Sequence, residues 1–505
     1  MRALDPRSVP GSRPITKALF ASGLQCAKKL FLDYHEPDAA PAESLRRQHL
    51  FEVGAQLLEL ARTAFPGSQT ADSGDFAKAL EQTSGWLGEG QRAPVFEAAF
   101  AVDDLEARAD IAIPNGEGAI DLYEVKAGNK VKVRHIRDLA FQVHVIEKAG
   151  YRVERVWILH LNPNYKHRGG ATYPVHQLFK HVDVSTKVRR QLDKTEEQVD
   201  ALRNVLQDPV TQELPTGTWC EIPFPCGYLP RCRAEGPEHP LIDLPELSRD
   251  QETELHQHGI EDLTQVDAEE PGLSAVQRRA ARALGSEDPI IESFVPKELR
   301  DVDYPLHFVI ATSLLQVMPL YEDQKPWQHV PFLWCDAVVD KDGSVEYESF
   351  VADGKDDPRP EFARTLGAAT EDAGTLMVFG ANLEQRLRRL LDDANEHKSA
   401  VRALLNQPRF DLRQLVRAGV YHRDFRGSFG LVDVYTALVG GNHFDGLEIQ
   451  SDEQAQAAYQ KMMTPRTRAT TRTKLQRQLE EFAKACADAV IAIYRALASH
   501  EAVSR

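Results

Sequence analysis

Two carboxylates and a lysine are spaced in this sequence as they would be around a divalent metal ion. Asp110 is followed by a turn and then by Glu124, Val125 and Lys126. Because successive residues of a strand face opposite sides, Glu124 and Lys126 are expected on one face and Val125 in the core. A hairpin would bring that face back to Asp110. Two carboxylates at one point suit Mg²⁺ or Mn²⁺, which are hard cations that prefer oxygen ligands.

Such a site predicts hydrolysis of a phosphodiester. A bound divalent cation lowers the pKa of a water ligand and neutralises charge in the transition state. A lysine beside it can orient that water or stabilise the phosphate. A surface strand with alternating charge is the other interpretation of the pattern. Further polar candidates lie on neighbouring predicted elements: Glu97 on the preceding strand, Gln142 on the following helix, and Glu52, Gln56 and Glu59 on an early helix.

Cysteines form the second group of residues with a chemically suggestive spacing. Cys220, Cys226 and Cys232 lie close together, Cys26 lies far upstream, and the other two of the six stand alone. Six cysteines distributed in this way do not form a disulfide scaffold. In a reducing compartment the cluster indicates a metal site.

Basic residues follow the Glu-Val-Lys motif and are the expected contacts for nucleic acid. The formal charge of −16 argues against a protein that coats nucleic acid over its whole surface. A local groove remains compatible with that charge, and a solvated basic loop is the alternative. The expected DNA contacts are Lys130, Lys132, Arg134 and His135, and the stretch Arg466–Arg477 is a further candidate.

The elements that must position these residues read as two α/β units. Apolar spacing predicts helices over 14–34, 44–65 and 136–149, and strands over 95–102, 107–113, 119–126 and 153–161. This order predicts an α/β fold with a mixed sheet. A long helix at 186–206, a helical connector and a second α/β unit from Tyr304 follow. At 505 residues, several domains are expected, with bounds of 1–238, 239–300 and 301–505. No apolar run is long enough to span a membrane, so the cytoplasm is the expected compartment.

The first half resembles the RecB-like PD-(D/E)xK nuclease domain. The likeness lies in the segment "EAAFAVDDLEARADIAI…LYEVKAGNKVKVRHIRDLAFQVHVIEKAGYRVERVWILHLNPNY". It is closest to a bacterial family in which that domain precedes an exonuclease-like domain. The resemblance implies that Asp110 and Glu124 bind the metal, that Lys126 is catalytic, and that Gln142 and Glu97 belong to the site. Many relatives carry a histidine on the early helix, where this chain has Gln56.

The cysteines resemble the iron–sulfur staple of RecB-like nucleases, including AddB and the CRISPR-adaptation nucleases. The matching segments are "SGLQCAKKLF" and "CEIPFPCGYLPRC". In that group one upstream cysteine and three downstream cysteines hold a 4Fe–4S cluster. Closing so long a loop would stabilise the fold by roughly 3–5 kcal/mol. Zinc is the rival, although its structural sites use shorter spacers than the five residues found here.

The second half resembles an RNase H-like domain of the DEDD exonuclease type, beginning at "VIATSLLQVMPLYEDQKPWQHVPF". The family's first Asp-x-Glu pair falls on Ile310 and Thr312. A later acid falls on Glu384, and the final Tyr and Asp fall on Phe482 and Cys486. Three of four acids are therefore missing, and two metal ions cannot be held by one carboxylate. The resemblance thus implies a pseudo-exonuclease kept for packing or for binding DNA or a protein partner.

The residues and the resemblance together predict a metal-dependent DNA nuclease, acting on ends or single strands in DNA repair or in defence against foreign DNA. The alternative is a non-catalytic nucleic-acid-binding or scaffold subunit of a nuclease or defence complex. A small-molecule redox enzyme is disfavoured, because no glycine-rich nucleotide motif follows a strand.

Overall fold

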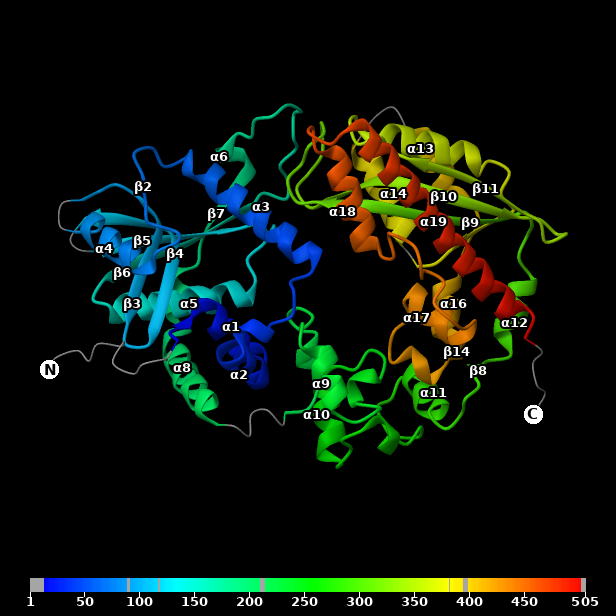
Figure 1. Ribbon diagram of the computed structural model, residues 1–505, viewed down its shortest axis with the longest axis horizontal. Helices are drawn as coiled ribbons and strands as arrows, with labels where there is room; N and C mark the ends of the chain where they lie inside the picture. The colour runs from blue at the N-terminus through cyan, green and yellow to red at the C-terminus, as the bar shows by residue number, and fades with distance from the viewer. Residues whose placement is uncertain are drawn as a thin grey trace. The chain divides into compact units, whose positions relative to one another are not determined.

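The computed structural model describes residues 13–88, 91–116, 119–208, 214–380, 382–393 and 398–500 (Figure 1). The chain divides into two compact units. Unit 1 consists of Met1–Pro215, Trp219–Cys232 and Val317–Trp327, and unit 2 of Thr216–Thr218, Arg233–Gln316 and Gln328–Arg505. Each unit combines helices with a mixed sheet, which confirms the predicted α/β class. Among the described helices, none combines the length and apolar character needed to cross a bilayer.

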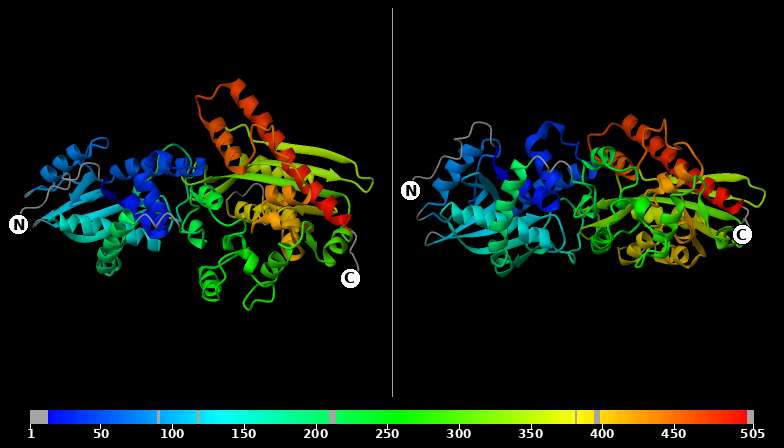
Figure 2. Two further views of the ribbon diagram at one scale, coloured as in Figure 1. Left: turned by 60° about the horizontal axis from the view of Figure 1, so that its bottom comes forward. Right: turned by 90° about the horizontal axis from the view of Figure 1, so that it is seen from below.

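The described part of unit 1 is built on a seven-stranded sheet (Figures 1 and 2). The path runs β2-β3-β4-β5-β6-β7, and β1 pairs with β4. The strands are β1 (Ile15–Thr16), β2 (Gln69–Thr70), β3 (Val95–Val102), β4 (Leu105–Gly116), β5 (Ala119–Lys126), β6 (Arg152–Leu161) and β7 (Phe179–Asp183). The three central hairpin strands lie where alternating apolar residues predict them.

Helices cover both faces of this sheet. Helix α5 (Val133–Lys148) packs on one face through Leu139, Phe141 and Val143, which share a core with Leu122 of β5. Helix α3 (Leu45–Arg62) packs on the other face, where its Val53 joins a separate core. The remaining helices are α1 (Lys17–Gln25), α2 (Ala27–His35), α4 (Phe76–Trp86), α6 (Val175–Leu178), α7 (Ser185–Arg189) and α8 (Leu192–Gln207), while α9 (Leu229–Glu235) lies where the chain passes into unit 2.

Two predicted helices are each broken in the structure. The single helix expected over 14–34 is wrong, because Cys26 is extended with φ −158° and ends α1 as it begins α2. The helix expected over 186–206 is likewise divided into α7 and α8. The first break has a consequence for the site, because it places Cys26 at the N-terminus of a new helix.

An unexpected part of unit 1 is the segment Val317–Trp327, which comes from the second half of the sequence. Val317 and Met318 are buried in the same core as Leu57 and Leu159. The Tyr173 hydroxyl donates to the Pro319 carbonyl at 2.9 Å. The segment therefore completes the hydrophobic core beneath β5 and β6.

Unit 2 contains a five-stranded sheet in the order β11-β10-β9-β12-β13 among its described residues. Strands β9, β10 and β11 are antiparallel neighbours, whereas β12 runs parallel to β9 and to β13. These strands are β9 (Leu306–Gln316), β10 (Gln328–Val339), β11 (Val345–Val351), β12 (Thr375–Val378) and β13 (Arg409–Asp411), with a two-stranded pair of β8 (Ile290–Ile291) and β14 (Val420–Tyr421).

Helices lie on both faces of the sheet of unit 2. The long α19 (Ala469–Ala498) and α18 (Asp452–Met463) share one core with β9 and β10, and α13 (Pro358–Ala369), α14 (Asn382–Asp393) and α15 (Lys398–Asn406) share the other. Figure 1 shows α19 running across the strands. The other helices are α10 (Arg249–Gln257), α11 (Ala275–Ala283), α12 (Phe294–Arg300), α16 (Leu412–Gly419) and α17 (Leu431–Leu438).

Candidate active site

Three acids lie side by side across three adjacent strands of unit 1. Phe96 pairs with Ile111 and Ala98 with Ala109, so Glu97 of β3 lies opposite Asp110 of β4. Ile111 pairs with Tyr123, so the next position sets Asp110 opposite Glu124 of β5. Neighbouring strands are about 5 Å apart, which brings these backbone positions together.

Glu97 has an unusual backbone conformation at this point. Its φ of 55° lies in the left-handed region, which is costly for a residue with a Cβ atom. Strain of this kind collects at functional sites, where the surrounding structure enforces it. The predicted extra acid is therefore beside Asp110 in register, and its conformation distinguishes it from an ordinary strand residue.

Glu124 is the centre of the polar network. It is 1% exposed, and its Oε1 accepts from Lys126 Nζ at 2.7 Å and from Lys17 Nζ at 2.9 Å. Its Oε2 accepts from Gln142 Nε2 at 3.1 Å. Three predicted site residues, Glu124, Lys126 and Gln142, are thus brought together. Lys17, at the start of α1, was not predicted, because its partner is 107 positions away and no local pattern links the two.

The two buried carboxylates respond oppositely to their surroundings. Burial and the nearby charge of Glu124 raise the pKa of Asp110 to about 7, although its Oδ2 accepts from the Val125 amide at 2.7 Å. Burial also opposes ionisation of Glu124, but Lys126 and Lys17 outweigh it and lower the pKa of Glu124. Burial likewise opposes the charge of Lys17, yet Glu124 and Asp110 raise its pKa. Glu124 is therefore the ionised member of the pair near neutral pH.

Helix α5 presents a polar stripe to this network. Its residues His135, Asp138 and Gln142 are spaced i, i+3 and i+7, which places them on one side of a helix whose other residues are mostly apolar. Burial raises the pKa of Asp138, and Lys126, Lys17 and Glu124 all act on it electrostatically. Asp138 is thus a further acid of the site. Its spacing from Gln142 is the signal by which the sequence could have indicated it.

The donor set is compatible with one divalent cation held by two carboxylates. Gln142 Oε1 is buried and has no hydrogen-bond partner within the described structure. An unpaired acceptor beside two acids fits a metal-bound water as donor, since Mg²⁺ retains several waters when one or two carboxylates bind it. Among the described residues, no three His, Cys, Asp or Glu side chains are already arranged to hold a metal ion.

The early helix does not contribute to this site. Strand alternation directs Glu124 towards α5, whereas Tyr123 and Val125 pack on the other face with α3. On α3, Val53 and Leu57 point into that core, while Glu52, Gln56 and Glu59 are exposed. The expectation that α3 supplies a ligand is therefore wrong.

The predicted basic cluster divides into exposed and buried residues. Lys130 is exposed, and Lys132 and Arg134 are partly exposed at the start of α5. His135 is 4% exposed, and its Nδ1 accepts from the Lys132 amide at 3.4 Å. Burial and the neighbouring cations Lys126, Arg134 and Lys132 lower the pKa of His135 to about 3. His135 is therefore a neutral helix cap, and the expectation that it contacts DNA is corrected.

The four predicted cysteine ligands all belong to unit 1, and none of them is part of a disulfide. The Gln25 side chain donates to the carbonyls of Trp219 and Phe224 at 3.0 and 2.9 Å, which fixes the cysteine loop beside Cys26. The Cys226 amide donates to the Cys220 carbonyl at 2.7 Å. Two further contacts join the segment to α2 and its C-terminal end, namely Tyr228 to Asp33 at 2.9 Å and Arg231 to Glu36 at 2.7 Å.

The backbone amides at the start of α2 favour the thiolate form of Cys26, whereas burial of its side chain opposes that form. Burial raises its pKa, and the charge of Cys226 adds to that rise. The amides of Lys29 and Lys28 act in the opposite direction. Helix N-terminal amides of this kind stabilise thiolate.

The positions in unit 2 that the resemblance assigns to the exonuclease acids do not carry a set of carboxylates. Thr312 is buried, and its hydroxyl donates to Asp452 at 3.4 Å. Arg386 donates to the Ala311 carbonyl, and the charge of Asp452 acts on it. Glu384 forms an ion pair with Arg388 at 2.6 Å, while Ile310, Phe482 and Cys486 have no acidic group. A cation, Arg386, thus occupies the neighbourhood of the first motif.

Other residues singled out in the second half have structural roles. Asp411 caps α16, and its Oδ1 also accepts from the Gly380 amide at 2.8 Å. Asp424 is mostly exposed in a short turn. In the stretch Arg466–Arg477, Arg472 donates to the carbonyls of Met462 and Thr464, whereas Arg468 and Lys474 are exposed.

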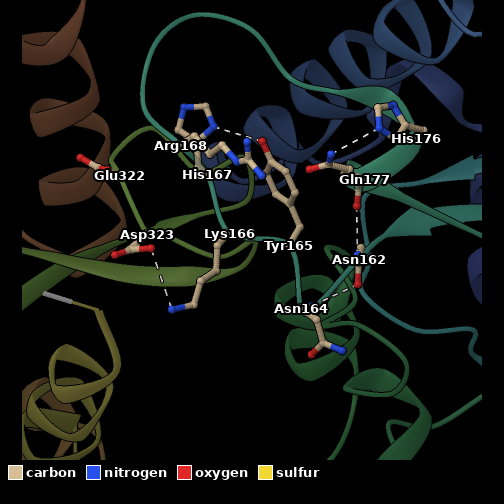
Figure 3. A pocket seen from close by; sticks show the side chains of 10 residues that line it. All are labelled: Asn162, Asn164, Tyr165, Lys166, His167, Arg168, His176, Gln177, Glu322 and Asp323. Atoms are coloured by element: carbon tan, nitrogen blue, oxygen red, sulfur yellow. Dashed lines mark hydrogen bonds and ion pairs between the residues drawn. The ribbon is translucent and has the colours of Figure 1, made fainter.

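A polar cavity of about 490 Å³ lies beyond the C-terminal end of β6 in unit 1 (Figure 3). His167 is buried there, with Tyr165 Oη 3.2 Å from its Nδ1. The His167 backbone also exchanges hydrogen bonds with the segment Val317–Trp327, through Gln324 and Asp323. Because Lys166 pairs with Asp323 at 3.9 Å, opposite charges meet at the rim. The cavity thus marks where this segment is fastened to unit 1.

Part of the second half of the chain matches a known protein family profile. Residues 312–430 match a family profile described as a domain of unknown function, DUF2779. No curated protein matches the sequence. The matched stretch begins in β9 and includes the segment Val317–Trp327, while Asp110, Glu124 and Lys126 lie outside it.

Proposed function

We propose that unit 1 is a metal-dependent DNA nuclease of the RecB-like PD-(D/E)xK type, acting on DNA ends or single strands. The observation that carries the proposal is the alignment of Glu97, Asp110 and Glu124 across three strands, with Lys126 and Gln142 hydrogen-bonded to Glu124. Acids and a lysine at such positions do not stabilise the hydrophobic core, because burying charged groups costs free energy. Such a cluster with shifted pKa values is typical of a functional site.

Each side chain has a distinct part in the proposed reaction. Asp110 and Glu124 would hold Mg²⁺ or Mn²⁺, which supplies an activated water and neutralises phosphate charge. Gln142 fixes the orientation of Glu124 through its amide. Lys126 and Lys17 place two positive charges where a scissile phosphate would lie, and this electrostatic contribution is commonly the largest in such reactions.

The cysteine group is proposed to bind a 4Fe–4S cluster, with zinc as the rival. Cys26, Cys220, Cys226 and Cys232 supply the four thiolates that either group requires. The contacts of Gln25 and Tyr228 support this assignment, because they tie the two cysteine segments together. Cysteine ligands used in this way suit a reducing cytoplasm.

Unit 2 is proposed to be a decayed exonuclease-like domain that binds DNA or a protein partner. The buried Thr312 and the nearby Arg386 and Asp452 support the loss of activity, since these residues leave no paired acids for two metal ions. The whole protein would then act in DNA repair or in defence against foreign DNA.

A non-catalytic nucleic-acid-binding or scaffold subunit is the alternative, and one observation favours it. Lys17 and Lys126 both pair with Glu124, so this carboxylate is already neutralised without a metal ion. A protein of that class would bind DNA without a divalent cation and would not cleave it.

Degradation of single-stranded, linear duplex and circular DNA with Mg²⁺ or Mn²⁺ tests the proposal. We expect cleavage of the single-stranded or linear substrates by the natural protein and by Lys180→Ala, an exposed lysine on β7 that serves as the matched control. Lys126→Ala should cleave about 10²–10³ times more slowly. Cleavage by Lys126→Ala at the natural rate, or no cleavage of any substrate by the natural protein, would favour the alternative.

A further inference from the structure

The cysteine loop of unit 1 exposes two large apolar side chains. Between Cys220 and Cys226, Ile222 is 65% exposed and Phe224 is 46% exposed. Two large apolar side chains exposed on one short loop are a candidate contact surface for another molecule. The arrangement points to a ligand with an apolar or aromatic face.

Phe224 is held in place rather than attached to a free loop. Its own carbonyl accepts from Gln25 at 2.9 Å, and the Cys226 amide closes the loop on the Cys220 carbonyl at 2.7 Å. The Arg134 guanidinium lies over the Phe224 ring at 4.7 Å from the centroid. Because the ring is already held in place by a cation, it loses little conformational entropy when a planar ligand stacks on it.

The neighbouring charges select an anionic ligand. Arg134 belongs to the first turn of α5, Lys132 caps that helix, and Lys130 precedes it. Burial and repulsion from Arg134 and Lys130 lower the pKa of Lys132, so the three cations lie near one another, and Asp138 acts electrostatically on Arg134. The cluster is locally basic although the net charge of the chain is −16. Arg134 and Gln142, which donates to Glu124, lie on the same helix, so this cation and the candidate site share one rigid element.

We propose that Phe224, stacked with Arg134, is a base-stacking platform for single-stranded DNA, with Lys130 and Lys132 contacting the adjacent phosphates. This inference rests on the proposed function for its choice of DNA, and it names the substrate class of that site. Single strands offer base faces that a duplex buries between its own base pairs, and aromatic–base stacking combined with a basic groove is the usual way to bind them. The cysteine group thereby acquires a second role, which is to hold the platform.

Binding to two oligonucleotides of equal length, one of thymidines and one with abasic sites, separates stacking from phosphate contact. The full chain is used with EDTA present, so that no cleavage occurs and a failure of the nuclease proposal leaves this test intact. We expect Phe224→Ala to weaken binding of the thymidine strand about fivefold or more. Its affinity for the abasic strand should be unchanged, and Phe224→Trp should retain the natural affinity for both.

Lys130→Ala should weaken binding of both strands, whereas Lys180→Ala should weaken neither. Equal affinities of Phe224→Ala and the natural protein for thymidine strands would overturn the platform. Equal losses on thymidine and abasic strands would overturn it too, since they indicate a structural effect of the loop. A comparable loss on blunt duplex DNA would contradict the single-strand assignment, and tighter binding of an oligouridine RNA would contradict the choice of DNA.

Discussion

Two lysines share a single carboxylate oxygen of Glu124, and this arrangement determines how the site balances its charge. Lys17 and Lys126 lie 2.9 and 2.7 Å from Oε1, while Asp110 Oδ2 accepts from the Val125 amide at 2.7 Å. Burial and repulsion from Glu124 therefore act on Asp110, and its pKa rises to about 7. The ionised form of Asp110 is therefore unfavourable in the folded protein, and a divalent cation bound beside it would stabilise that form.

Replacing Asp110 by Asn is expected to stabilise the metal-free protein above pH 7. The folded-state pKa of about 7 exceeds the unfolded value of 3.8, so the folded protein holds a proton more tightly between these values. This contribution to stability is fully present below the unfolded pKa, falls as the pH rises from 3.8 to about 7, and stays lost above that, whereas Asn carries no such dependence. We predict a melting temperature for Asp110→Asn a few degrees higher at pH 8 in EDTA, since about 1 kcal/mol corresponds to about 2–4 °C.

The same variant should equal the natural protein in stability near pH 4, where Asp110 is protonated. Adding Mn²⁺ at pH 8 should stabilise the natural protein and leave Asp110→Asn unchanged, because ligand binding stabilises only a state that binds it. A lower melting temperature for Asp110→Asn at pH 8 in EDTA would show that the carboxylate is not under this stress.

At the residue scale, the sequence predicts what lies within one hairpin and its following helix. Asp110, Glu124, Lys126 and Gln142 meet because strand alternation and helical periodicity dictate their directions. Lys17 reaches Glu124 only through the pairing of β1 with β4, a long-range contact without a local pattern. His135 was misassigned because a basic neighbourhood in the sequence does not reveal that its ring turns inward.

At the element scale, the end of β5 is fixed by a side chain from the distant segment Val317–Trp327. Trp327 Nε1 donates to the carbonyl of Ala127, which directly follows Lys126. Trp327 itself has a φ of 62°, in the left-handed region that L-residues rarely adopt. Sequence patterns could not predict this, because the segment reads as a loop between two strands of unit 2.

Trp327→Phe is expected to keep most of the packing but remove this hydrogen bond. Leaving the Ala127 carbonyl without its donor should cost about 1–3 kcal/mol and reduce DNA cleavage by loosening Lys126. Trp157→Phe is the matched control, because the Trp157 Nε1 is buried without a partner and its removal should cost little. Thermal melts and cleavage rates measure both effects, and equal behaviour of the two variants would refute the positioning role of Trp327.

The break between α1 and α2 is a second element-scale feature, and it bears on the cysteines. An extended Cys26 presents its thiol at a helix N-terminus, beside the loop that Gln25 fixes. Local helix propensity predicted one continuous helix here, because the interruption is set by contacts with residues almost 200 positions later.

Cys226→Ser is expected to abolish the visible absorbance of an iron–sulfur cluster and to destabilise the fold by roughly 3–5 kcal/mol. Cys335→Ala, a buried cysteine of unit 2 outside the proposed ligand set, should retain the absorbance and the iron content. Absorption spectra and elemental analysis after anaerobic purification provide the measurement. If the natural protein is colourless and contains stoichiometric zinc, the four cysteines bind zinc and not an iron–sulfur cluster.

At the scale of the whole molecule, the two units differ in whether the expected acidic residues are present. Unit 1 aligns Glu97, Asp110 and Glu124 on adjacent strands, whereas unit 2 has Thr312 and Arg386 near the position where the resemblance places the first acidic pair. The α/β class of both units followed from periodicity in the sequence, because strands and helices of this length are set locally. The assignment of Val317–Trp327 to unit 1 did not follow from it, since only tertiary contacts decide that.

Whether catalysis belongs to unit 1 and not to unit 2 is tested most directly by the rate of Mn²⁺-dependent cleavage of single-stranded DNA. The variants Lys126→Ala and Glu384→Gln are each compared with the natural protein. Loss of one electrostatic group from an active site commonly costs about 10²–10³ in rate, which is the loss predicted for Lys126→Ala. Glu384→Gln removes only an ion pair with Arg388 and should cleave at the natural rate. An unchanged rate for Lys126→Ala together with a large loss for Glu384→Gln would place catalysis in unit 2 and contradict the account.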